Sequence, residues 1–195
     1  MTSARSLTAS IGLLAMLVLA PVHSASSDTG DVDECQVVAR SWSEIETLIA
    51  TPIAPEPEQT DTLPWGEQVA ADDLIAIRGT VEQFIACSNL GEPLRVLALY
   101  TDDYVQRLLA RERPLIDRAR YDGLATPMPV DPDSGAVLTG ISGARRIVAT
   151  GQLGALVTIT YPSVPEPKTF FFTFRWIGDS LRIDDILGEI TFSVP

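Results

Sequence analysis

Histidine is nearly missing from this chain of 195 residues, which contains a single one, His23. Serine–histidine–aspartate and cysteine–histidine catalytic groups need an imidazole as the general base, and many zinc and iron sites use it as a ligand. His23 lies in an N-terminal segment that we interpret as a cleaved export signal, so the mature protein is expected to contain none. Acid–base chemistry would then fall to carboxylates and tyrosines.

Lysine is equally scarce, because thirteen of the fourteen basic residues are arginines and only Lys168 remains. Lys168 follows a proline-rich turn, an exposed place that does not suit a desolvated Schiff-base nucleophile. Acidic residues outnumber basic ones by 26 to 14, which gives a formal net charge of −12. Nucleic acids and anionic membrane surfaces recruit basic patches, so this balance argues against both as partners. The excess of acid also keeps a protein soluble, which is a sufficient explanation for it.

The first 24 residues have the order of a secretory signal peptide. Arg5 is the only charged residue in this segment, the apolar run Ile11–Ala20 follows, and Pro21 then leads to a cleavage point after Ser24. A membrane-spanning helix needs about 20 apolar residues, more than this run supplies. We therefore predict a signal peptide over residues 1–24, a secreted or extracytoplasmic protein, and no membrane span after cleavage. An uncleaved anchor or a buried helix is the alternative.

Cysteine is limited to Cys35 and Cys87. An even pair in a chain exported to an oxidising space predicts a disulfide bond between them. The alternative is two separate thiols, with Cys87 buried as a small apolar residue on its helix. Two cysteines without histidine do not complete a structural zinc site. We expect neither a metal site nor a cofactor.

Residues 25–69 are expected to precede the main domain as an acidic lead-in, a short helix and a proline-rich linker. Ser41 with Glu44, or Ser43 with Glu46, can form a capping box at the start of the helix. The helix has one apolar face, which must pack against another part of the protein to be shielded from water. We interpret the linker as a tether that lets the helix fold back on the main domain, where the disulfide would fix it.

The main domain is expected over residues 70–195 and begins with helices. Apolar residues recur at helical spacing over 72–88, a second helix follows Pro93, and Thr101 can cap a third. Further along the chain the hydrophobic period changes to two. Four antiparallel strands are predicted from this pattern, over residues 145–150, 155–161, 169–177 and 181–192. Helices followed by a meander predict an α+β fold, with helices packed on one face of the sheet.

The dipeptide Gly178-Asp179 is a hairpin signal that fixes which side chains share a face. Counting from this turn pairs Phe174 with Ile183 and Phe172 with Asp185. One face then carries apolar side chains and a single acid; its members are Phe170, Phe172, Phe174, Trp176, Leu181, Ile183, Leu187 and Asp185. The opposite face carries Thr173, Arg175, Arg182 and Asp184, and we expect these charges to neutralise one another at the surface.

A carboxylate among aromatic rings is desolvated, which raises its pKa and suits an acid–base group. Asp185 is therefore the candidate catalytic or pocket acid. Two alternatives stay open: a bulge after Ile183 that turns Asp185 outward, or a buried Asp185 that caps backbone N–H groups. Tyr100 and Tyr104 flank a helix start and are further pocket candidates, although half-buried tyrosines are ordinary core residues.

The stretches Ile77–Pro93 and Leu97–Asp103 have the pattern of opening helices, and Phe172–Trp176, Gly178-Asp179 and Leu181–Ile186 that of a closing hairpin. Together they resemble the nuclear transport factor 2-like (SnoaL-like) domain family, and with the export signal the chain is similar to a secreted bacterial member. The resemblance implies a cystatin-like cone, in which helices pack on the concave face of a curved antiparallel sheet around a pocket. The aromatic face would turn towards that pocket.

The family that the chain resembles includes both enzymes and non-catalytic modules, so the fold does not decide function. Its dehydratase-type sites rely on histidine, and its isomerase-type sites need a base, a tyrosine and a second acid, of which Asp185 matches one generic acid. We expect a non-catalytic module that binds a small apolar ligand or a protein partner. The alternative is a carboxylate/tyrosine-dependent isomerase, dehydratase or cyclase acting on a small hydrophobic substrate, with Asp185 and Tyr100 or Tyr104 at one cavity. A homodimer formed through the sheet is a further possibility.

Overall fold

The structure, a computed structural model, describes residues 34–53, 63, 66–110, 117–131 and 134–189. The predicted signal peptide, most of the predicted acidic lead-in and proline-rich linker, and the expected strand end beyond residue 189 lie outside these ranges. Within them, no helix combines the length and the apolar composition that crossing a bilayer requires.

The predicted N-terminal helix is α1 (Trp42–Ala50). Of the two possible capping boxes, the structure uses the first: the Ser41 hydroxyl accepts from the Glu44 N–H, and the Glu44 carboxylate accepts from the Ser41 N–H. These bonds satisfy backbone donors that a helix start leaves without partners. The apolar face buries Ile45 and Leu48 in the core.

Four more helices follow among the described residues. The first three lie where the apolar spacing, Pro93 and the Thr101 cap predicted helices. The four are α2 (Ala71–Asn89), α3 (Pro93–Ala98), α4 (Asp102–Ala110) and α5 (Arg118–Leu124). Gly91 has φ +63 directly after α2, a conformation that glycine adopts without cost, and Pro93 opens α3. Thr101 caps α4 by accepting from the Tyr104 N–H at 3.3 Å.

Five strands form one antiparallel sheet in sequence order, so the chain is an α+β protein as predicted. They are β1 (Gly66–Gln68), β2 (Val137–Ile147), β3 (Leu153–Tyr161), β4 (Val164–Ile177) and β5 (Ser180–Glu189). The expected strand at 145–150 was misplaced, and β1 was not predicted. The pairing of β2 with β3 shifts register at two places, between Leu138 and Gly140 and between Ser142 and Arg145. Such irregularities hide the period of two that reveals a strand in a sequence.

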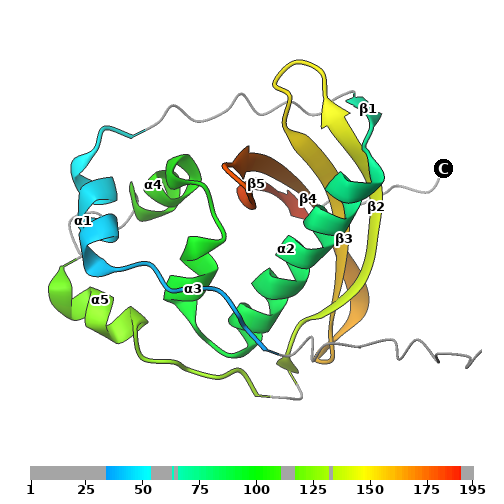
Figure 1. Cartoon of the computed structure of the whole chain (residues 1–195). Helices are drawn as coiled ribbons and strands as arrows, with labels where there is room; N and C mark the ends of the chain where they lie inside the picture. Colours follow the sequence, from blue (N-terminus) through cyan, green and yellow to red (C-terminus); the bar gives the residue numbers. More distant parts are fainter. Residues whose placement is uncertain (1–33, 54–62, 64–65, 111–116, 132–133, 190–195) are drawn as a thin grey trace, which may run out of the picture. The chain divides into compact units, whose positions relative to one another are not determined.

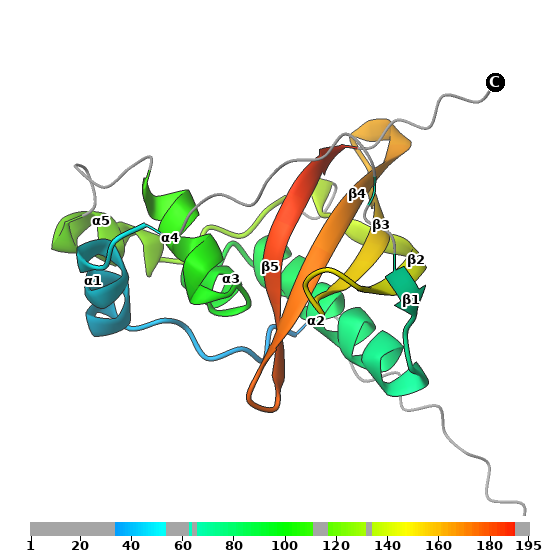
Figure 2. The same cartoon turned by 90° about the horizontal axis from the view of Figure 1, so that it is seen from above.

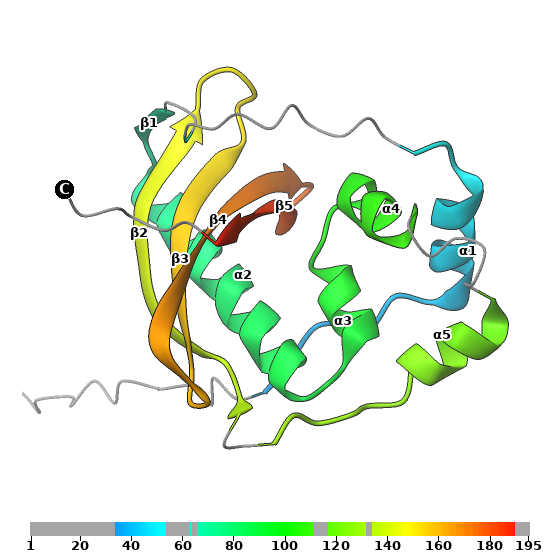
Figure 3. The same ribbon diagram turned by 180° about the vertical axis from the view of Figure 1, so that it is seen from behind.

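Helix α2 lies along the concave face of the sheet (Figures 1 and 3). Ile77 and Val81 of α2 are fully buried in one core cluster with Phe174 of β4 and Val157 of β3. Side chains of the protein itself therefore fill the concave face where these α2 residues pack on the sheet.

The edge of β5 is covered by the connection between α3 and α4. Ile183 donates its N–H to the Leu99 carbonyl at 2.9 Å, and its carbonyl accepts from the Thr101 N–H at 2.9 Å. Tyr100 thereby forms a parallel bridge with Ile183. Pairing of this kind removes open hydrogen-bonding groups from an edge strand. It also brings α3 and α4, with α1 packed on α4, to the β5 side of the sheet (Figure 2).

The disulfide between Cys35 and Cys87 is present, as predicted. It joins the segment before α1 to the last turns of α2, and Arg95 of α3 donates to the Cys35 carbonyl at 2.7 Å. Helix α1 packs against α4, whereas most of the linker that was interpreted as a tether lies outside the described residues.

The β4–β5 hairpin turns at Gly178-Asp179, and the predicted pair Phe174–Ile183 is confirmed. The predicted pair of Phe172 with Asp185 is wrong, because Phe172 pairs with Ile186 and Thr173 pairs with Asp185. A bulge after Ile183 inserts Asp184 into the strand and shifts the register from there on. This is the alternative that the sequence left open.

Candidate functional site

The predicted aromatic face is a packed core. Phe172 and Phe174 are almost fully buried, and their rings stack at a centroid distance of 6.1 Å. Phe84 of α2 packs its edge against Phe172 at 5.8 Å, and Phe170 lies partly buried against the same cluster. Trp176 is 41% exposed at the end of the row, where its indole N–H donates to Asp73 of α2 at 3.2 Å.

Asp185 and Asp184 take different positions from those that the sequence predicted. Asp185 is half-buried, its carboxylate accepts from the Ile186 N–H at 2.9 Å, and it lines neither of the cavities described below. Asp184, expected at the surface, is 4% exposed and accepts from the Thr101 hydroxyl at 2.7 Å, from Gln152 and from Arg175 at 3.0 Å. Because these donors satisfy its oxygens, buried Asp184 is a structural link from β5 to the start of α4, the β2–β3 connection and β4.

Tyr100 and Tyr104 lie together, with ring centroids 4.9 Å apart in an edge-to-face arrangement. Tyr100 is 7% exposed, and burial, followed by the neighbouring Tyr104, raises the pKa of its hydroxyl above the usual range. Its phenol therefore stays neutral. Tyr100 lines the cleft described next, whereas Tyr104 is not among the lining residues and carries the Arg107 guanidinium over its ring at 5.4 Å.

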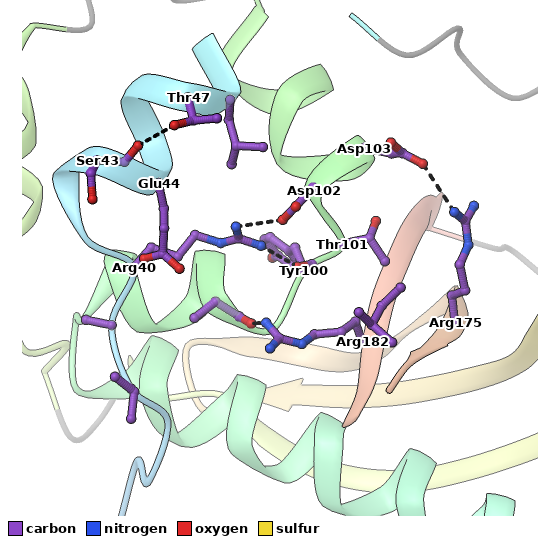
Figure 4. Close-up of a pocket in the computed structure, with 15 residues that line it drawn as sticks. Arg40, Ser43, Glu44, Thr47, Tyr100, Thr101, Asp102, Asp103, Arg175 and Arg182 are labelled. Carbon is purple, nitrogen blue, oxygen red and sulfur yellow. Dashed lines mark hydrogen bonds and ion pairs between the residues drawn. The ribbon is translucent and has the colours of Figure 1, made fainter. Parts of the chain in front are cut away.

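A cleft of about 810 Å³ lies between α1, the α3–α4 connection and the ends of β4 and β5 (Figure 4). Its volume falls in the range of small-molecule sites. The charged members of its lining are three arginines and three acids: Arg40, Arg175, Arg182, Glu44, Asp102 and Asp103. The hydroxyl-bearing residues Ser43, Thr47, Tyr100 and Thr101 and the apolar residues Val38, Leu48 and Ile177 complete most of the lining.

Arg40 fixes one wall of the cleft. Its guanidinium donates to the Leu97 carbonyl at 2.9 Å, to the Tyr100 carbonyl at 2.8 Å and to the Asp102 carboxylate at 2.7 Å. Its own carbonyl accepts from the Tyr121 hydroxyl at 3.0 Å, and its side chain is buried. Arginine has a planar fork of five donors, which suits this multiple contact.

The other two arginines come from the paired positions Arg175 and Arg182 of the hairpin. Arg175 forms ion pairs with Asp103 at 3.2 Å and with Asp184 at 3.0 Å. Arg182 donates from one terminal nitrogen to the Ala98 carbonyl, and in Figure 4 it reaches into the cleft beneath Arg40. Desolvation lowers the pKa of Arg182, and the positive charge of Arg40 acts in the same direction.

Glu44 enters the cleft lining from the first turn of α1. The backbone N–H and then the hydroxyl of Ser41 stabilise its carboxylate, so the pKa of Glu44 is lowered from its usual value. The charged carboxylate of Glu44 is therefore already hydrogen-bonded within the helix cap.

A second cavity, of about 150 Å³, lies between the end of α2 and β3 and includes Phe84, Ile85, Ile159 and Tyr161 in its walls. Over the described ranges of the chain, no cluster of three or more metal-ligating side chains occurs. No family model, curated protein or solved structure matches this chain.

The cleft was not predicted from the sequence. Arg175 and Arg182 were placed on the face opposite the aromatic row, where they were expected to be neutralised by acids at the surface. The α3–α4 connection covers that side of β5, so the arginines become walls of a cleft. Arg40 gave a weak signal, as a single charge between an apolar stretch and the capping serine.

Proposed function

We propose that this chain is an exported, non-catalytic binding module whose ligand occupies the cleft beside α1. The observation that carries the proposal is the contrast between the two candidate sites. The aromatic face expected to line a pocket is filled, whereas the cleft has about 810 Å³ of space and walls held by hydrogen bonds. Side chains that are already fixed in place lose little freedom when a ligand binds. The predicted signal peptide supports export, and the disulfide is compatible with an oxidising compartment.

The arrangement of polar groups favours binding over catalysis. The rival enzyme needs Asp185 and a tyrosine at one cavity point, but Asp185 is not in the lining of the cleft and the Tyr100 hydroxyl has a raised pKa. Among the acids of the cleft, Asp102 and Asp103 are paired with arginines and Glu44 caps α1. The oxygens of these three carboxylates are therefore already engaged by groups of the protein itself.

We also propose kinship with nuclear transport factor 2-like domains. It is supported by the motifs of the opening helices and closing hairpin and by the position of α2 on the concave face of the sheet. In this chain the proposed binding site would lie outside the concave face, on the β5 side of the sheet.

The test is a screen of a defined library of small carboxylates, amines, sugars and neutral apolar compounds, read by amide chemical shifts of the ¹⁵N-labelled mature protein. Thr47→Trp places a bulky ring at the exposed wall of the cleft. Glu46→Trp adds the same ring to α1 at an exposed position outside the lining, and serves as the matched control.

Hits are expected to shift amides of Ala98–Asp103 and Arg182, to lose affinity by about tenfold in Thr47→Trp, and to keep it in Glu46→Trp. Each bound compound should also be recovered chemically unchanged after long incubation, as judged by mass spectrometry. Hits that map away from the cleft would contradict the site, and a converted compound would contradict the non-catalytic assignment.

A further inference from the structure

Arg182 differs from the other two arginines of the cleft in how its charge is balanced. Arg40 is paired with Asp102, and Arg175 is paired with two carboxylates. Among the residues that the structure describes, no carboxylate forms an ion pair with Arg182, and the hydrogen bond that its guanidinium makes goes to the Ala98 carbonyl. Much of its five-donor fork is therefore available to a ligand.

The surroundings make this unpaired charge costly. Arg182 is partly buried, and desolvation and the nearby Arg40 both act against its charged form. Asp102 and Glu44 act in its favour, but Arg40 and Ser41 already engage these carboxylates. A group that brings a negative charge into the cleft would relieve this imbalance, and a planar fork of donors matches the two oxygens of a carboxylate.

The net charge of the cleft lining favours a ligand with a single negative charge. Its three arginines are balanced by three acids, so the wall as a whole is neutral. A dianion such as a phosphate monoester would meet repulsion from Glu44, Asp102 and Asp103, whereas a single carboxylate needs the Arg182 fork alone.

Apolar groups near the same site provide room for the rest of the ligand. Val38 is 86% exposed and Ile177 is 50% exposed, and both line the cleft. Leu48 and Ala98 add further apolar surface to its wall. An aliphatic body would remove this surface from water at about 25 cal/mol per Å².

From this juxtaposition we infer that the cleft binds a monocarboxylate with an aliphatic body, with its carboxylate on the guanidinium of Arg182. The inference rests on the proposed function, because it names the ligand class of the same cleft.

The experiment uses octanoate as the probe, with octanamide as its neutral counterpart and octyl phosphate as the dianion, each titrated into the mature oxidised protein by calorimetry. Arg182→Gln removes the charge, and Arg182→Lys keeps the charge but loses the fork. Arg78→Gln is the matched control, an exposed arginine of α2 that does not line the cleft.

Octanoate is expected to bind the wild type and Arg78→Gln equally, and to bind Arg182→Gln at least about tenfold more weakly, with Arg182→Lys in between. Octanamide and octyl phosphate should bind the wild type at least about tenfold more weakly than octanoate. The Arg182 side-chain Nε–H resonance should shift when octanoate is added to the wild type, which keeps the inference testable if Arg182→Gln folds poorly.

Equal octanoate affinity for wild type and folded Arg182→Gln, or an unshifted Nε–H resonance, would overturn the assignment of the carboxylate to Arg182. If octanamide bound as tightly as octanoate, the negative charge of the ligand would not contribute to binding. If octyl phosphate bound more tightly than octanoate, the inferred ligand class would be a dianion and not a monocarboxylate. If octanoate does not bind but amines, sugars or neutral compounds of the library shift the cleft amides, the ligand class is wrong and the proposed function stands. If no compound shifts the cleft amides, the proposed function itself fails.

Discussion

Reduction of the Cys35–Cys87 disulfide is expected to remove a large part of the stability of this domain. The bond joins residues separated by 52 positions. In the chain-entropy model a closed loop of this size lowers the entropy of the unfolded chain by about 14 cal/mol/K, which corresponds to about 4 kcal/mol at 25 °C. Folded domains have a free energy of unfolding of about 5–15 kcal/mol, so the loss should be easy to measure.

The assay is urea unfolding of the mature protein with and without a phosphine reductant, followed by tryptophan fluorescence and far-ultraviolet circular dichroism. With an m-value of about 2 kcal/mol/M, the midpoint should fall by about 2 M on reduction. The oxidised protein is compared with the reduced wild type and not with a cysteine variant, because reduction keeps the sulfur atoms of buried Cys35 and Cys87 in the core.

The double variant Cys35→Ala/Cys87→Ala serves as the control and should not respond to the reductant. It should be less stable than the reduced wild type, because truncating the fully buried Cys87 leaves a cavity. Equal midpoints for the oxidised and reduced wild type would refute the loop-entropy reasoning.

Three further predictions concern the residues that hold the cleft and the turns. Arg40→Met removes three side-chain hydrogen bonds and should cost about 3 kcal/mol in urea unfolding, and an unchanged midpoint would contradict its role. The lowered pKa of Glu44 means that its carboxylate stabilises the fold above its usual value of 4.5 and stops doing so as the pH falls through the folded pKa. The stability advantage of wild type over Glu44→Gln should therefore be present at neutral pH and vanish in acid, and an advantage that persists there would exclude ionisation as its source. Gly91→Ala places a Cβ 1.8 Å from the Met128 carbonyl oxygen at φ +63 and should cost more than about 2 kcal/mol, whereas Gly178→Ala, at φ +58 with open space, should cost about 1 kcal/mol. Equal losses at the two glycines would show that the contact with Met128 does not matter.

The local features of the fold were readable because each depends on neighbours in the sequence. The capping serine and Glu44 lie three residues apart, the apolar period of α2 repeats within its own turns, and Gly178-Asp179 turns a hairpin by its own backbone preferences. The disulfide followed from an even cysteine count and the expected compartment.

The register beyond Ile183 could not be read in this way. A bulge inserts one extra residue into a strand, and contacts with the rest of the protein decide whether it forms. The sequence of β5 alone therefore allows either Asp184 or Asp185 to face inward. Contacts with Thr101 of the α4 cap and with Arg175 satisfy Asp184 in the interior, and these donors come from elsewhere in the chain.

The α+β class, the helix starts and the hairpin turn were predictable because local hydrogen bonding and hydrophobic periodicity encode them, and the disulfide was predictable from the even cysteine count. The position of the cleft depends on long-range contacts. Helix α2 packs on the aromatic side chains of the sheet, and pairing of Tyr100 with Ile183 brings α3, α4 and α1 to the β5 side. Arg40 and Arg182 are 142 positions apart in the sequence and meet in one cleft through these long-range contacts, which no local pattern records.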